Sequence, residues 1–125
     1  MSTRWAHWPF RILTTVAAVL LFDQAVFAGQ FLSGTYPALH THRANATYAG
    51  LTVLAAGLSA ILVRWPGRGP WWPMPASAVL FGLIALQIEL GFSRGLTIHV
   101  PLGVLIIGLG ALLAGWAWRY RQVAA

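Results

Sequence analysis

Two histidines are conspicuous in this sequence because polar side chains are rare around them. His42 and His99 each lie near the start of an apolar stretch, 57 positions apart. A neutral imidazole on each of two facing helices is the arrangement that binds an iron porphyrin through both axial positions. These residue types at this spacing therefore predict a bis-histidine site for haem b between the second and fourth apolar stretches.

The residues near each histidine suit such a site. One helical turn inward the sequence has a small residue, Ala46 or Gly103, which would leave room for a flat macrocycle. Arg43 and Arg94 lie near the same end, where their guanidinium groups could donate hydrogen bonds to haem propionates. We expect all four residues to contribute to cofactor binding.

Other interpretations of the histidines are open. His40 would point away from His42 on a helix, but on extended backbone this pair could bind zinc or copper together with His99. His42 and His99 could also be structural, hydrogen-bonded to loop carbonyls. Ligation is favoured because ionisable residues inside a membrane usually mark function. His7 is interpreted as an interfacial side chain.

A few further polar residues could carry protons or contact a substrate: Asp23, Gln30, Gln87 and Glu89. Asp23 falls near the middle of the first apolar stretch, so we expect it to face the bundle interior, protonated or paired. Glu89 is better explained by a structural ion pair with Arg43 or Arg94. No residue is assigned a catalytic role.

The elements that must position these residues are spanning helices. The chain is 58% hydrophobic and 8% charged over 125 residues, a composition suited to lipid. Four apolar runs, at about 10–32, 44–63, 75–92 and 98–118, are each near the length of about 20 residues that crosses a bilayer. Short connections make neighbouring helices antiparallel. The sequence predicts one domain over 1–125, an all-α four-helix integral membrane bundle.

The charges indicate the orientation. The net charge of +6 comes from eight arginines, most of which flank the apolar runs and form no continuous patch, which argues against nucleic acid. By the positive-inside rule both termini are cytoplasmic, in a bacterial-type inner or plasma membrane. A cleaved signal peptide ending near 26–28 is the competing interpretation.

The absence of cysteine excludes disulfides and iron–sulfur clusters.

The chain matches itself at a shift of 57 positions. The matches include Trp8 with Trp65, Gln30 with Gln87, and His42 with His99. They predict a tandem repeat of two helical hairpins, about 8–64 and 65–121, related by a pseudo-twofold axis along the membrane normal. Chance similarity between apolar sequences is the alternative.

The segment Leu86-Gln87-Ile88-Glu89-Leu90-Gly91, followed by His99, resembles the heme A synthase family, as does 30–34 followed by His42. The resemblance covers most of the chain and implies a four-helix half with His42 and His99 as axial ligands. The sequence departs from the catalytic half of that family, which has a glutamate where this chain has Leu39, and from members with an outward cysteine pair. It is also similar to b561-like and other small four-helix membrane cytochromes.

These observations predict a b-type membrane cytochrome that transfers electrons or serves as a haem-bearing subunit. Six-coordinate iron argues against oxygenase chemistry. One alternative is a haem-modifying enzyme resembling heme A synthase, and another is a cofactor-free accessory subunit packed through small residues. The expected partners are the lipid bilayer, a membrane redox protein or larger membrane complex, and further copies of the chain.

Overall fold

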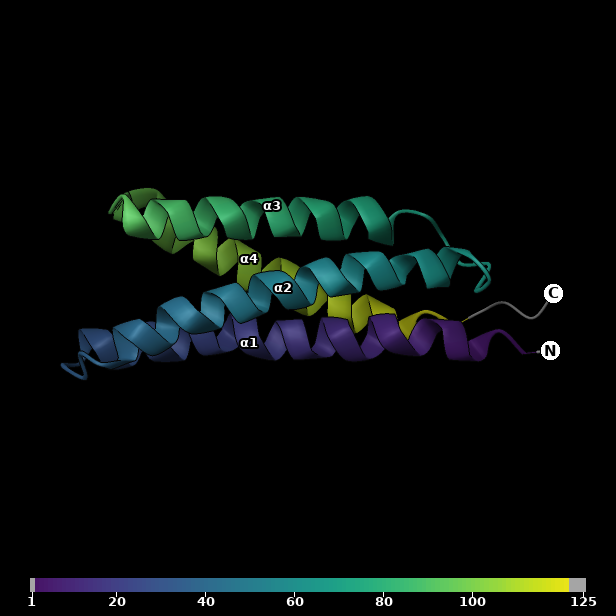
Figure 1. Cartoon of the computed structure of the whole chain (residues 1–125), viewed down its shortest axis with the longest axis horizontal. Coiled ribbons are helices and arrows are strands. Elements are labelled where there is room, and N and C mark those ends of the chain that lie inside the picture. The colour runs from purple at the N-terminus through teal and green to yellow at the C-terminus, as the bar shows by residue number, and fades with distance from the viewer. Residues whose placement is uncertain (1, 122–125) are drawn as a thin grey trace.

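The computed structural model describes residues 2–121, and within that range it consists of helices joined by short connections, with no strand (Figure 1). Its elements are the 3-10 helix η1 (Arg4–His7) and the helices α1 (Trp8–Leu32), α2 (Ala38–Arg64), α3 (Pro73–Phe92) and α4 (Leu96–Arg119). The four α-helices are each long and apolar enough to cross a membrane, as predicted. Residue 1 and residues 122–125 of the predicted domain lie outside the described residues.

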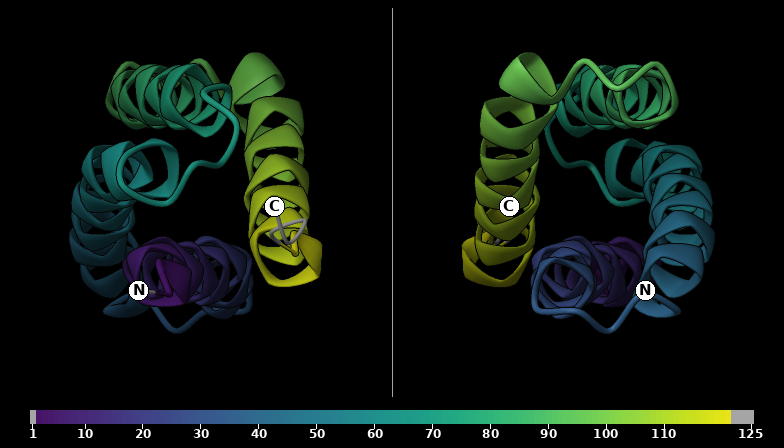
Figure 2. Two further views of the ribbon diagram at one scale, coloured as in Figure 1. Left: turned by 90° about the vertical axis from the view of Figure 1, so that its right-hand side faces the viewer. Right: turned by 90° about the vertical axis from the view of Figure 1, so that its left-hand side faces the viewer.

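The helices form a ring in which each packs against its neighbours in the chain and α4 packs against α1 (Figure 2). As a result α2 and α4 lie diagonally across the bundle. We call the end with both termini and the 65–72 connection the terminal end, and the end with the 33–37 and 93–95 connections the hairpin end. Toward the hairpin end, α3 and the start of α4 diverge from the α1–α2 pair in Figure 1.

Both hairpins turn on a residue in the left-handed region. At the end of α1 this residue is Gly34, with φ 99°, and the N–H of Thr35 donates to the carbonyl of Gln30 over 2.9 Å. At the end of α3 it is Arg94, with φ 63°, and the N–H of Gly95 donates to the carbonyl of Leu90 over 2.9 Å. Each of these two hydrogen bonds satisfies a carbonyl in the last turn of the helix, and the next helix begins a few residues later.

Helix α2 begins at Ala38, whereas the apolar pattern predicted a start near 44. The residues between these points are mostly polar, so they add nothing to an apolar run, but they continue the same helical hydrogen bonding. His42 therefore lies in the second turn of α2. His99 is in the first turn of α4.

The core is built from regularly spaced buried positions. In α1 they are Phe10, Thr14, Ala17 and Leu21, and in α3 they are Pro73, Ser77, Leu80 and Ile84. The two sets have identical internal spacing and are offset by 63 positions. Buried positions in α2 and α4 include Ala49, Val53, Ala56 and Ala60, and Ile106, Gly110, Leu113 and Ala117, which are offset by 57.

Candidate functional site

The structure brings His42 and His99 together near the hairpin end of the bundle. Their ring centroids lie 6.4 Å apart and the ring planes are inclined by 60°. Both side chains are partly buried. Because α2 and α4 are diagonal neighbours, the two imidazoles meet across the interior of the bundle.

Each imidazole is held by a backbone carbonyl of the preceding helix. The Nδ1 atom of His42 lies 3.0 Å from the carbonyl oxygen of Gln24, and that of His99 lies 2.9 Å from the carbonyl oxygen of Gln87. A carbonyl only accepts, so Nδ1 carries a proton in both rings, and in the neutral form of each ring the lone pair is on Nε2. Histidines that bind metals are usually oriented by such a hydrogen bond.

Gln24 is a contact of His42 that the sequence pattern did not indicate. The side chain of Asn45, also overlooked, donates to the carbonyl of Leu20 over 2.8 Å and to Oε1 of Gln24 over 2.9 Å. Asn45 is buried and thereby ties α2 to α1 beside His42. The sequence did contain a signal for Gln24, because a shift of 63 positions pairs it with Gln87. The shift of 57 positions instead paired Gln87 with Gln30, which is exposed.

Gly103 accommodates a side chain of the protein. A Cβ at this position would lie 2.8 Å from Nε2 of Gln87, and that amide nitrogen donates to the carbonyl of His99 over 2.8 Å. The space expected here for a macrocycle is therefore filled by Gln87, whose Oε1 is buried without a hydrogen-bond partner. Ala46, its counterpart beside His42, is partly buried.

Gly91 lies against the imidazole of His99. A Cβ on Gly91 would lie 3.1 Å from Cε1 of His99. Glycine thus lets the imidazole of His99 pack directly on the backbone of α3.

The charged residues near the hairpin end are mostly exposed. The guanidinium of Arg43 lies over the ring of Phe92, 5.1 Å from its centroid. Arg94 and Glu89 are exposed, and within residues 2–121 the Glu89 carboxylate forms no ion pair with either arginine, contrary to the prediction. Asp23 is partly buried, in the half of α1 nearer the hairpin end.

The alternative zinc or copper site is wrong. His40 lies on α2 and is exposed, so the backbone is not extended there. Over the described part of the chain no group of three histidine, cysteine or acidic residues comes together to hold a metal ion.

His7 is more enclosed than an interfacial side chain. It is 5% exposed, and its Nε2 lies 3.2 Å from the carbonyl oxygen of Gly67. Gly67 and Gly69 of the connection between α2 and α3 pack against the imidazole. The connection therefore folds back over the N-terminal end of α1.

Comparison with protein-family models, curated protein sequences and solved structures finds no match to this chain.

Proposed function

We propose that the chain is a membrane-embedded b-type cytochrome in which His42 and His99 bind the iron of one haem b from opposite sides. The observation that carries the proposal is the pair of imidazoles on diagonal helices, each oriented through Nδ1 by a backbone carbonyl. Two imidazoles are a donor set that gives six-coordinate, low-spin haem.

The spacing of the rings fits that role. Metal–imidazole bonds of about 2.0–2.1 Å on opposite sides of one ion place the two ring centroids about 6 Å apart. The observed separation is 6.4 Å. Gln87, whose side chain fills the space beside Gly103, would have to move aside for the macrocycle to enter there.

Bound haem would supply one-electron transfer with no open iron position. The residues of the chain would fix the cofactor. The carbonyls of Gln24 and Gln87 set the tautomer of each histidine, and the exposed guanidinium groups of Arg43 and Arg94 are the candidate partners of the propionates. This assignment favours electron transfer, directly or as a haem-bearing subunit of a larger membrane complex.

We further propose that the helices span a bacterial-type inner or plasma membrane with the terminal end in the cytoplasm. Most arginines lie at that end, as the positive-inside rule requires. The equal spacing of buried positions in α1 and α3, and in α2 and α4, supports a tandem repeat of two hairpins. The core positions of α1 and α3 are offset by 63 and those of α2 and α4 by 57. The stretch that joins the two core sets is therefore six residues longer in the first hairpin than in the second.

The test is the absorption spectrum of the protein purified in detergent. We expect a reduced-minus-oxidised spectrum of low-spin haem that is lost in His42→Ala and in His99→Ala. His40→Ala is the matched control, because His40 is exposed and lies on the same helix as His42. A colourless protein would overturn the proposal and favour a cofactor-free accessory subunit.

Mass spectrometry of the extracted cofactor separates the cytochrome from a haem-modifying enzyme. We expect unmodified protohaem. Turnover to a hydroxylated or formylated haem would favour the enzyme that the resemblance to heme A synthase suggests.

A further inference from the structure

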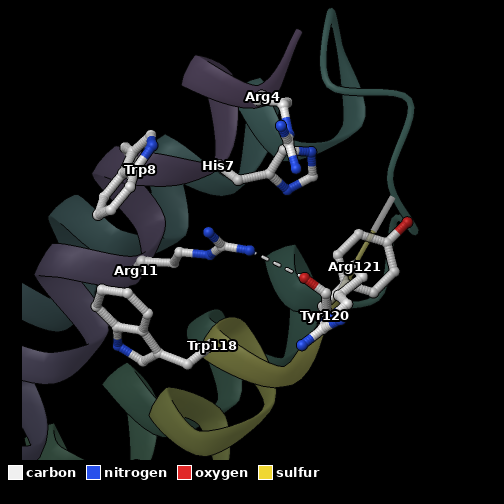
Figure 3. Close-up of a pocket in the computed structure, with 7 residues that line it drawn as sticks. All are labelled: Arg4, His7, Trp8, Arg11, Trp118, Tyr120 and Arg121. Carbon is white, nitrogen blue, oxygen red and sulfur yellow. Dashed lines mark hydrogen bonds between the residues drawn. The ribbon is translucent and has the colours of Figure 1, made fainter. Parts of the chain in front are cut away.

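A cavity of about 530 Å³ lies at the terminal end of the bundle, far from the histidine pair. It is formed where the start of α1 meets the end of α4 (Figure 3). Its lining is basic and aromatic and consists of Arg4, His7, Trp8, Arg11, Trp118, Tyr120 and Arg121.

No acidic side chain balances the arginines of this cavity. The chain has only two acids, Asp23 and Glu89, and both lie toward the opposite end of their helices. Three guanidinium groups that share one cavity repel each other, and an anion bound among them would relieve that repulsion. The charge pattern therefore favours an anionic ligand.

Arg11 is held in place for such a ligand. Its Nε donates to the carbonyl of Ala117 and one terminal nitrogen donates to the carbonyl of Tyr120, both over 2.9 Å. Its guanidinium carbon lies 5.7 Å from the ring centroid of Trp8 and 5.6 Å from that of Trp118. Figure 3 shows the side chain extended between the two indoles. Because a guanidinium has five N–H donors, three remain for an anion.

The aromatic wall is also fixed. Trp8 and Trp118 meet edge to face with centroids 5.7 Å apart, and Nε1 of Trp118 donates to Thr15 over 2.8 Å. Tyr120 lies against His7, with ring centroids 5.6 Å apart. Tryptophan and tyrosine are typical of the level where lipid headgroups meet the hydrocarbon. The cavity is therefore placed at headgroup depth if the helices span a membrane.

We propose that this cavity binds the phosphodiester headgroup of an anionic phospholipid. The fork of a guanidinium matches two phosphate oxygens, and basic pockets between helices on the cytoplasmic side suit such headgroups. The inference rests on the proposed membrane orientation but not on haem, so it stands or fails independently of the cytochrome assignment.

The test is titration calorimetry of the full chain in neutral maltoside micelles with a short-chain phosphatidylglycerol. We expect saturable binding, weakened about 25-fold in the double variant Arg4→Gln/Arg121→Gln, or about fivefold for each arginine. Both side chains are exposed, so neutralising them leaves the packing intact. The control is Arg68→Gln/Arg119→Gln, which removes the same charge from exposed positions outside the cavity lining.

Several results would overturn the proposal. An equal loss of lipid affinity in the two double variants would mean that the lipid responds to the overall positive charge of the surface and not to a specific site. Binding of short-chain phosphatidylcholine as tight as that of phosphatidylglycerol would remove the requirement for an anion. Inorganic phosphate that displaces the lipid at equal concentration would assign the cavity to a free anion. Unchanged binding in Arg4→Gln/Arg121→Gln would show that these arginines are not part of the site.

Discussion

Substitution of Gly103 by alanine tests whether this glycine exists to accommodate Gln87. The new Cβ would lie 2.8 Å from Nε2 of Gln87, so the amide must withdraw by about 0.6 Å to reach ordinary contact. That movement pulls the amide away from the carbonyl oxygen of His99, its present acceptor at 2.8 Å. We therefore expect a hydrogen bond to be weakened or lost next to the candidate haem ligand.

The expected loss in the free energy of unfolding is estimated by comparison with a matched glycine substitution in the same helix. Gly108→Ala meets nothing within 4 Å, so it gains helix propensity at no steric cost. Gly103→Ala gains the same propensity but loses a partly buried hydrogen bond, which contributes about 0.5–1.5 kcal/mol. We expect the free energy of unfolding of Gly103→Ala to be about 1 kcal/mol lower than that of Gly108→Ala.

The assay is equilibrium unfolding of the haem-free protein in mixed micelles, completed as a double-mutant cycle with Gln87→Ala. When Gln87 is truncated, Gly103→Ala should cost no more than Gly108→Ala, because the steric conflict is gone. Equal stability of the two single variants would refute the reasoning. The reasoning would also be refuted if Gly103→Ala still lowered the free energy of unfolding relative to Gly108→Ala when Gln87 is alanine.

Two further predictions use the same unfolding assay. Arg11→Gln should lower the free energy of unfolding by about 2–3 kcal/mol, because it removes charge-assisted bonds to two carbonyls at the end of α4. An effect as small as that of the exposed control Arg119→Gln would contradict it. Arg94→Gly should raise the free energy of unfolding by about 1 kcal/mol, since φ is 63° at this position. A loss of stability in Arg94→Gly would show that its side chain contributes more than its backbone costs.

The four helices were predictable because length and apolar composition are properties of the sequence alone. The start of α2 was not, since the polar residues from His40 to Arg43 are helical through backbone hydrogen bonds that hydropathy does not detect. The rings of His42 and His99 lie 6.4 Å apart, so both side chains point from diagonal helices toward the interior of the bundle. The pairing of two histidines in an apolar sequence was the signal for these inward faces.

Backbone atoms and connections account for most of what was missed. The carbonyl of Gln24 orients His42, and a carbonyl carries no residue-specific signal. Gln24 matches Gln87 at an offset of 63 and His42 matches His99 at an offset of 57, so the self-similarity at 57 did not indicate Gln24. His7 is buried by the folding of the 65–72 connection over it, a tertiary event that the boundary position of His7 does not encode.

The central claim is that two imidazoles bind one iron, and imidazole rescue tests it most directly. The oxidised protein should show the electron paramagnetic resonance signal of bis-imidazole low-spin haem. His99→Gly should lose that signal, and added imidazole should restore it by occupying the space that the side chain leaves. A low-spin signal that survives the loss of either His42 or His99 would contradict the account.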